Sequence, residues 1–556
     1  MLYYDFKVIR PKGTKINRRN GLAYVYHVVS SRYIPEKKYN VDSKVCIGKM
    51  IDDTFMAPND NYFKYYDHQV ETLEQPKEQS DTLKIGNHLL IQKVMKNLGL
   101  DTLIDSVYEE KACAIKDILS YMLVTEDSVM QHYSDYAYEH CLFSNKVFDD
   151  CFISKLLKEG ICYREMELFT NAWNQLQNKE QPIYISYDST NMNTMARGIE
   201  IAEYGHAKDD DEKPQVNISY AIRHEDSMPL FQEIYPGSIV DIAQCKFMVE
   251  KAKELGYKNP GFILDRGYCS IENIRYFDKN DYGFLMMMKS NQKLVKEAIE
   301  EVRIKLRLNA GTYLGEHEVN GITLQKKLYA KDPKERYYHV YYDDIQGANQ
   351  RNQLMQHYER IKKELDKKVD AKITRRENAG EYEKIFHLNY DDQGYLKGYR
   401  IKEQELQKQV DACGYFVIVS SKRMEAEEAL SIYRNRDGVE KLFRNLKTWL
   451  GYDTYRVHTT ESLESKSHLL FIASILRNEI YQKLKPIYKK DRKNYTVPSV
   501  MRELEKISVT RNVNGSYVRR YGLTNKQKKI YEQFGIHESE INDLVQQINT
   551  YLVIRK

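Results

Sequence analysis

A chain of 556 residues is too long for one hydrophobic core, so we expect several domains. With 42% hydrophobic and 30% charged residues, the composition is that of a globular protein, and the longest apolar run, near residues 469–476, is too short to span a bilayer. The eight cysteines form no CxxC pair, which argues against a zinc ribbon or a disulfide framework. No apolar signal core follows the N-terminus, so we expect a cytoplasmic protein without a membrane partner.

The net charge of +5 is unevenly distributed. Residues 1–50 contain eleven Lys or Arg against three acidic residues, residues 481–530 contain fourteen against three, and the rest carries −14. Basic ends favour a polyanionic partner held at the ends of the chain. On charge alone, solvated faces without a partner remain the alternative.

The first 178 residues divide at a change of periodicity. Residues 1–85 have β-branched and aromatic runs and predict a basic, β-rich region. Its segment 11–20 is predicted to be a loop that carries Lys12, Lys15, Arg18 and Arg19. Residues 86–178 have helical periodicity and form a candidate DNA-binding domain, although no segment matches a recognition helix.

An α/β pattern occupies residues 179–299. Three strands are followed by helix, strand, helix and strand, which is the order of an RNase H-like mixed sheet. The predicted elements, in that order, are 182–188, 214–224, 229–238, 245–257, 261–265, 271–281 and 282–290.

Residues 300–412 interrupt this pattern and predict a β-rich insertion domain with a charged helix at 353–370. Residues 413–485 resume the core, with a strand at 414–422 and two helices. Residues 486–556 predict a basic, helical C-terminal region.

The helix expected over residues 431–450 carries an unusual polar face. At 100° per residue, Tyr433, Arg436, Glu440 and Lys447 fall within an arc of about 60°, beside an apolar stripe. A carboxylate flanked by cations and a phenol suits a site for a metal ion and a phosphate. The alternative is a solvated helix with i,i+4 ion pairs such as Arg436–Glu440.

Asp188 and Asp265 each end a predicted buried strand, where ligands of open α/β sheets bind. A buried carboxylate is costly without a partner, so each needs a cation. With Glu440 they supply the hard oxygen ligands that suit two Mg²⁺ or Mn²⁺ ions, which in such sites lie about 3.5–4 Å apart. For either aspartate alone, the alternative is a turn or cap residue. His206 and His224 are interpreted as structural or loop residues.

These residues carry a resemblance to a known family. The set Asp188, Asp265 and Glu440 within Tyr433-x2-Arg436-x3-Glu440-x6-Lys447 resembles the bacterial insertion-sequence DDE transposases with the Y-R-E-K signature. Segments 204–216 and 262–268 are also similar to that group, as are the spacings of 77 and 175 residues between the three acids. The resemblance implies an RNase H-like catalytic core with a β-rich insertion between the second and third acids.

The resemblance also implies roles. The three acids would bind the metal ions for cleavage of transposon ends and their transfer to target DNA, in some members through a hairpin. Arg436 and Lys447 would hold phosphates and Tyr433 would lie near the cleaved end, with Lys208 and Arg266 as further candidate DNA contacts. The partners would be double-stranded terminal inverted repeats and target DNA, bound by a homodimer associated with the nucleoid. The acidic run 209–212 departs from this pattern and has no explanation.

Two other functions share these features: an RNase H-like nuclease that does not join strands, and a catalytically silent DNA-binding relic. Three retained acids argue against a relic. A long insertion and two basic ends argue against a simple nuclease.

Overall fold

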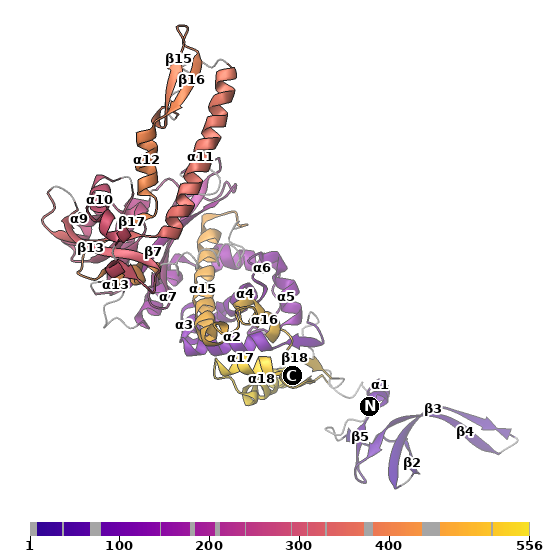
Figure 1. Ribbon diagram of the computed structural model, residues 1–556. Coiled ribbons are helices and arrows are strands. Elements are labelled where there is room, and N and C mark those ends of the chain that lie inside the picture. Colours follow the sequence, from indigo (N-terminus) through magenta and orange to yellow (C-terminus); the bar gives the residue numbers. More distant parts are fainter. Residues whose placement is uncertain are drawn as a thin grey trace. The chain divides into compact units, whose positions relative to one another are not determined.

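A computed structural model (Figure 1) represents the chain. It describes residues 8–19, 21–35, 38–66, 79–144, 146–177, 184–205, 212–239, 241–258, 260–290, 292–308, 310–328, 331–371, 382–435, 456–512 and 515–554.

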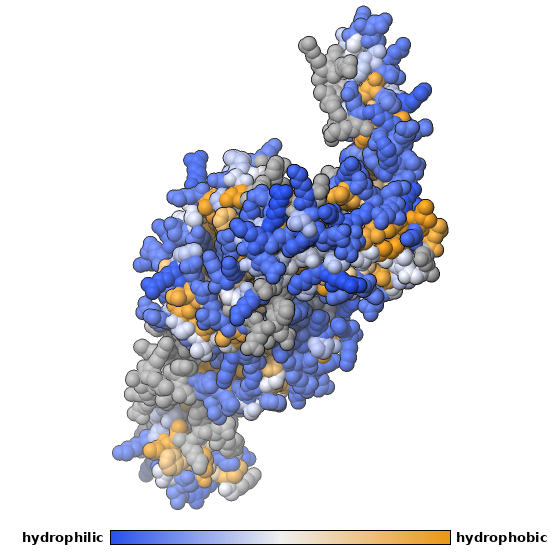
Figure 2. All heavy atoms as spheres, turned by 90° about the vertical axis from the view of Figure 1, so that its left-hand side faces the viewer, coloured by the Kyte–Doolittle hydropathy of each residue, from blue (hydrophilic) through white to orange (hydrophobic). Residues whose placement is uncertain are grey.

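The chain forms two compact units. The terminal unit combines Met1–Gly160 with Glu479–Lys556, and the central unit is Ile161–Asn478. Among the described helices, none is both long and apolar enough to cross a membrane. On the face drawn in Figure 2, hydrophilic residues predominate and hydrophobic residues form separate patches.

The central unit is built on a nine-stranded sheet of order β12-β13-β14-β17-β11-β10-β7-β8-β9. Its strands are β7 (Tyr184–Asn193), β8 (Gln215–Arg223), β9 (Pro229–Pro236), β10 (Gly261–Leu264), β11 (Gly283–Met287), β12 (Tyr313–Leu314), β13 (Val319–Lys327), β14 (Glu335–Tyr342) and β17 (Tyr415–Ser420). Strands β7, β8 and β9 are antiparallel neighbours, and β10 and β11 continue from β7 in parallel. Helix α8 (Asp241–Glu254) precedes β10 and α9 (Ile271–Lys279) precedes β11, as predicted.

Helices cover both faces of this sheet. In β10, Phe262 and Leu264 belong to a buried cluster shared with α8, α9 and α10 (Lys293–Leu308), whereas Ile263 belongs to a cluster shared with α13 (Ala426–Arg434). Alternate residues of a strand point to opposite faces. Helix α13 therefore lies on the face opposite to α8 and α9.

Helix α7 (Tyr163–Gln175), part of the predicted helical segment 86–178, belongs to the central unit. Its buried Trp173 donates from Nε1 to the Pro229 carbonyl at 2.9 Å, and Asn174 donates from Nδ2 to the Leu230 carbonyl at 2.7 Å. The predicted domain boundary after residue 178 would put α7 and β9 in different domains, although α7 packs on β9. Helical periodicity identified the helix but carried no information about its partner.

An arm leaves the central sheet between β14 and β17. Figure 1 shows α11 (Asp344–Asp370) and α12 (Glu403–Ala412) rising together to the hairpin of β15 (Phe386–Tyr390) and β16 (Leu396–Ile401). A small core of its own, including Ile361, Leu365 and Phe386, stabilises it.

This arrangement differs from the predicted β-rich insertion over 300–412. Strands β13 and β14 extend the central sheet, because every residue of β17 pairs with a residue of β14. The longest element of the segment is the helix α11. The charged helix predicted at 353–370 is confirmed as the later part of α11. The remaining boundaries of the six predicted domains stay predictions.

The terminal unit brings together segments from both ends of the chain. Beyond residue 80, the α-helices that lie wholly in this unit are α2 (Gly86–Asn97), α3 (Leu100–Tyr108), α4 (Ala112–Thr125), α5 (Tyr133–Glu139), α6 (Asp150–Lys155), α16 (Val497–Leu504), α17 (Asn525–Glu532) and α18 (Glu538–Ile554). Strand β6 (Thr82–Lys84) forms a three-stranded sheet with β18 (Ser508–Arg511) and β19 (Tyr517–Arg519). Helix α15 (Thr460–Tyr488) begins in the central unit and ends in the terminal unit.

Close contacts fix this union of distant segments. A Cβ atom on Gly86 would lie 2.3 Å from the Leu504 carbonyl oxygen, so only glycine lets α2 approach α16 this closely. The Glu505 carboxylate accepts from Asn87 Nδ2 at 3.0 Å and lies 2.8 Å from His140 Nε2. Residues 80–140 and 497–511 therefore share one core.

Residues 8–66 form a separate sheet of order β1-β5-β4-β3-β2. Its elements are β1 (Val8–Ile9), β2 (Lys15–Arg19), β3 (Leu22–Ile34), β4 (Tyr39–Met50), β5 (Phe55–Pro58) and helix α1 (Asp60–Tyr66). The predicted loop at 11–20 was wrong for residues 15–19, which form the edge strand β2 against β3. Because every residue of β2 is exposed, its sequence lacks the apolar alternation that identifies a strand.

Candidate active site

The register of the central sheet brings Asp188 and Asp265 to the same level. Tyr187 of β7 pairs with Leu264 of β10 in parallel, and each aspartate is the next residue of its chain. Neighbouring strands lie about 4.8 Å apart. Two carboxylate-bearing positions, 77 residues apart in sequence, are thus adjacent at the carboxyl end of β10. The prediction that Asp188 ends its strand was wrong, because β7 continues to Asn193 through its pairing with β8.

Asp265 marks the point where a buried strand becomes a turn. All four residues of β10 are buried, whereas Asp265 is half-buried and caps the short 3-10 helix η6 (Arg266–Tyr268) by accepting from Arg266 N at 2.7 Å. At the other end of η6, the buried Tyr268 hydroxyl donates to Ser189 Oγ at 3.2 Å. This bond ties the turn back to β7.

Helix α13 delivers Tyr433 to Asp265. Ala429 and Leu430 anchor the helix in the buried cluster on that face of the sheet, and Tyr433 itself is 7% exposed. Its hydroxyl lies 3.5 Å from Asp265 Oδ1, at the outer limit of a hydrogen bond. Tyr433 and Asp265 were predicted to share a site, and the structure brings them together.

Both residues line a pocket of about 460 Å³. Its walls come from the ends of β10 and β11, the start of β17, α10, α11 and α13. The lining residues are Asp265, Arg266, Met287, Met288, Ser290, Val295, Gln346, Gln350, Tyr415, Phe416, Val417, Leu430, Tyr433 and Arg434. The exposed Arg266 provides a cation beside the Asp265 carboxylate.

Four predicted site residues fall outside the described part of the chain: Arg436, Glu440 and Lys447 in 436–455, and Lys208 in 206–211. Helix α13 ends at Arg434, so only the beginning of the predicted 431–450 helix is described. Among the described side chains, no three His, Cys, Asp or Glu groups gather to hold a metal ion, and Glu440 and the Asp188 side chain lie outside that set.

Sequence reasoning missed Arg434. Its Nη1 donates to the His317 carbonyl at 3.0 Å, and the neighbouring Ser431 Oγ lies 2.8 Å from His317 Nε2. The two contacts hold the turn between β12 and β13 against α13 beside the pocket. The predicted signature pointed instead to Arg436, two residues further along.

Sequence reasoning also missed Gln346 and Gln350, which α11 contributes from the arm. Gln350 Oε1 accepts from Gly414 N at 2.8 Å, which fixes the first turns of α11 against the start of β17. No local signal marks these residues, because they reach the pocket only through tertiary packing.

His224 lies away from this edge of the sheet. Its backbone N–H donates to the carbonyl of Tyr184, four residues before Asp188 in β7, and its Nδ1 lies 3.1 Å from Ser186 Oγ. Burial lowers the pKa of His224 to about 4, so the ring is neutral at pH 7. These contacts favour a structural role. His206 lies outside the described residues.

Comparison with known proteins identifies the family. Residues 180–476 match the model described as Transposase DDE domain, a span that contains Asp188, Asp265 and Glu440. No curated protein matches the sequence. Among solved structures, the chain is similar to the cryo-EM structure of the piggyBac transposase synaptic complex with hairpin DNA, with 10% identity and a TM-score of 0.35 over 83% of this chain and 82% of that chain. Because the family match covers more than half of its residues, the chain belongs to the transposase DDE domain family.

Proposed function

We propose that this chain is an insertion-sequence transposase of bacterial type that cleaves transposon ends and joins them to target DNA. The observation that carries the proposal is the register of β7 and β10, which sets positions 188 and 265 side by side, with Asp265 lining the pocket. Within the transposase DDE domain family, such a pair is a natural place for phosphodiester chemistry.

The order β9-β8-β7-β10-β11, with three antiparallel strands followed by two parallel ones, supports an RNase H-like core. Strands β17, β14, β13 and β12 would be additions to that core on its β11 side. Ligands of mixed α/β sheets bind at the carboxyl ends of parallel strands, which is where Asp265 and the pocket lie.

The residues present fit a divalent-metal site. Asp265 is a half-buried carboxylate that lines the pocket of about 460 Å³. It accepts hydrogen bonds from the Arg266 backbone N–H and the Tyr433 hydroxyl. We propose that Asp188, Asp265 and Glu440 hold two Mg²⁺ or Mn²⁺ ions. When bound, such ions activate the attacking oxygen and stabilise the leaving oxygen of an in-line displacement.

The protein's own groups would orient the site and the DNA. The Tyr433 hydroxyl would donate to Asp265 Oδ1 and leave the second carboxylate oxygen free for the site. Arg266 lies beside Asp265 and would contact a phosphate of the bound strand, as would Arg436, Lys447 and Lys208. Guanidinium groups suit bidentate capture of phosphate, whereas lysines supply point charges.

The assembly would be a homodimer on paired ends, because two ends must be cut and joined together and a C2 dimer presents two identical sites. The DNA partners would be terminal inverted repeats and target duplex. Its place in the cell would be the cytoplasm, on the nucleoid when bound to DNA.

A cleavage and joining assay tests this function. The substrate is a labelled duplex that carries the element's own flanking ends, incubated with Mg²⁺ or Mn²⁺ and a supercoiled target plasmid. We expect nicking and strand transfer by the parent chain, and neither by Asp265→Asn, which keeps the shape of the side chain but loses its charge.

The matched control is Asp226→Asn, a carboxylate of the same unit that pairs with Arg223 in the turn between β8 and β9. It should retain both steps. Cleavage that persists in Asp265→Asn, or in excess chelator, would refute the proposed site. Cleavage without strand transfer would refute the transposase function and support an RNase H-like nuclease that does not join strands.

A further inference from the structure

The C-terminal part of the terminal unit is strongly basic. Residues 485–532 contain thirteen Lys or Arg and four Asp or Glu, a net charge of +9. Most of the basic side chains are exposed. An excess of this size within 48 residues produces a positive potential that attracts polyanions.

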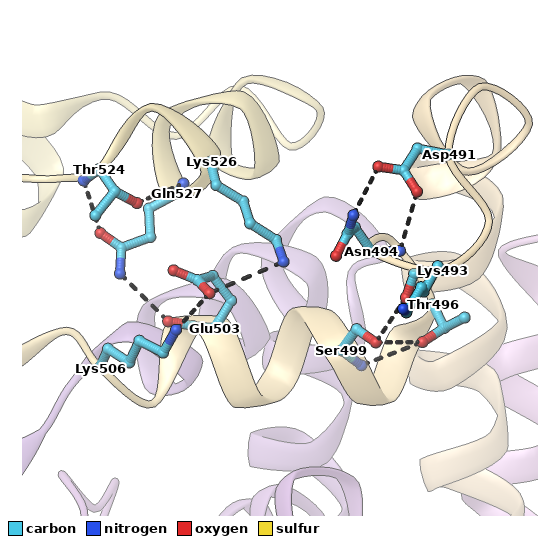
Figure 3. A network of polar contacts seen from close by, with 10 residues as sticks. All are labelled: Asp491, Lys493, Asn494, Thr496, Ser499, Glu503, Lys506, Thr524, Lys526 and Gln527. Carbon is cyan, nitrogen blue, oxygen red and sulfur yellow. Dashed lines mark hydrogen bonds and ion pairs between the residues drawn. The ribbon is translucent and has the colours of Figure 1, made fainter.

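Two of the four acidic residues of this region, Asp491 and Glu503, are already engaged by neighbouring side chains (Figure 3). Asp491 accepts from both the backbone N and the side-chain Nδ2 of Asn494, at 3.3 and 2.9 Å. Glu503 forms an ion pair with Lys506 at 2.7 Å and a longer one with Lys526 at 3.9 Å. The hydrogen bonds from Asn494 lower the pKa of Asp491, so this carboxylate stays charged while it accepts hydrogen bonds within its own turn.

Two segments combine to form one basic face. The turn 489–494 follows α15, and α17 lies against it, because Tyr495 at the end of the turn has Lys526 Nζ and Lys529 Nζ at 5.8 and 5.0 Å from its ring centroid. The ring is 8% exposed, so it holds both ammonium groups over a fixed support. The basic face consists of Lys489, Lys490, Arg492, Lys493, Lys526 and Lys529.

Capped helices make the face rigid. Thr496 caps α16 by accepting from Ser499 N at 3.2 Å, and Ser499 Oγ reaches back to the Lys493 carbonyl at 3.3 Å. Thr524 and Gln527 form a reciprocal capping box at the start of α17, and Gln527 Nε2 also donates to the Glu503 carbonyl at 3.3 Å. The backbone that carries the lysines is therefore tied to α16.

Within the described residues, five members of the face, all except Lys526, have no ion-pair partner. Uncompensated cations on a rigid, exposed surface fit a partner with regularly spaced negative charges. Duplex DNA supplies such charges, and its affinity for proteins depends mainly on phosphate contacts.

We infer that the basic face is a docking surface for the sugar-phosphate backbone of double-stranded DNA. The choice of DNA as the polyanion rests on the proposed function. The surface belongs to the terminal unit, and none of its residues lines the pocket at Asp265.

The experiment measures binding of the full chain to a short labelled DNA duplex by fluorescence anisotropy, in chelator so that no cleavage occurs. The test variant is Lys489→Ala/Lys493→Ala/Lys529→Ala. The control variant, Lys146→Ala/Lys155→Ala/Lys158→Ala, removes the same charge from exposed lysines near α6 in the same unit. Thermal melts of both variants check that they are folded.

We expect the test variant to bind about 100-fold more weakly at about 0.1 M salt. The slope of log affinity against log salt should fall by about 2.7, or about 0.9 for each lost phosphate contact. The control variant should match the parent. An unchanged slope in the test variant, with a parent that binds DNA, would refute this inference and leave the proposed function intact.

A parent chain that does not bind duplex DNA at all would refute both proposals. A third arm replaces the DNA with single-stranded RNA of equal length. If the substitutions weaken RNA binding and leave duplex binding unchanged, the face serves another polymer and the inference is wrong.

Discussion

The Tyr433 side chain has two roles, which substitutions can separate: its ring packs in a buried cluster, and its hydroxyl contacts Asp265. The ring of Tyr433 is buried in the cluster beneath α13, while its hydroxyl reaches Asp265 Oδ1 at 3.5 Å. Tyr433→Phe removes only the oxygen, whereas Tyr433→Ala also removes the ring. The two substitutions therefore report on orientation of the carboxylate and on packing, respectively.

The expected magnitudes follow from this geometry. A hydrogen bond to a carboxylate contributes about 1.5–3 kcal/mol at good geometry, and at 3.5 Å we expect about 1 kcal/mol. Tyr433→Phe should therefore slow end cleavage about 5-fold with little change in stability. Tyr433→Ala should lower the free energy of unfolding by about 3–5 kcal/mol, the usual cost of deleting a buried aromatic ring.

Single-turnover nicking of a transposon-end duplex, measured over a titration of Mg²⁺, tests the positioning role. If the hydroxyl orients Asp265 toward the metal site, Tyr433→Phe raises the Mg²⁺ concentration needed for half-maximal rate, which a purely structural defect would not do. Urea unfolding of both variants gives the stability change. A Tyr433→Phe variant with the parent's rate and Mg²⁺ dependence would refute the reasoning.

Two further predictions concern stability. Gly86→Ala should destabilise the terminal unit by about 1–3 kcal/mol, because its Cβ would lie 2.3 Å from the Leu504 carbonyl oxygen. Helix propensity alone predicts that Gly86→Ala stabilises the unit by about 1 kcal/mol, so the sign of the change in unfolding free energy distinguishes the steric effect from propensity. Gly522→Ala is the control in urea unfolding, because a Cβ atom at position 522 would have no atom within 4 Å. Buried His339, flanked by Thr323 Oγ1 and Ser420 Oγ at 3.0 Å each, has its pKa lowered by burial to about 4. As pH falls, the His339 ring is protonated in the unfolded chain before it is protonated in the folded protein, which favours the unfolded state. The free energy of unfolding should therefore fall by about 3 kcal/mol as pH drops from about 6.5 to about 4. His339→Gln should flatten that part of the profile, and identical slopes for parent and variant would contradict it.

The sequence was informative where local patterns determine structure. The run from Gly261 to Leu264 identified a buried strand, and a carboxylate directly after it predicted the position of Asp265. The helical spacing grouped Tyr433 with Arg436, Glu440 and Lys447, whereas its place in one site with Asp265 was implied by the family resemblance. The structure puts the Tyr433 hydroxyl 3.5 Å from that carboxylate. The strand prediction needed only the local pattern, but the pairing of helix and strand needed the resemblance.

The sequence was uninformative where structure depends on distant partners. Gln346 and Gln350 line the pocket because α11 packs against Gly414, and Arg434 reaches His317 across more than a hundred residues. The edge strand β2 was mistaken for a loop because neither of its faces is buried. Periodicity in one segment does not report which other segment covers it.

The pairing of β6 with β18 also has a consequence for synthesis on the ribosome. Residues 82–84 emerge early, but their strand partner at 508–511 is made only after the whole central unit. Helices α2 to α6 are synthesised long before the segments that cover them, so part of their apolar surface stays exposed until residues 497–554 are made. Nascent chains in this condition recruit chaperones or aggregate. A copy shortened by a late stop codon would lose these C-terminal strands and helices, and with them the core that residues 80–140 share with residues 497–511.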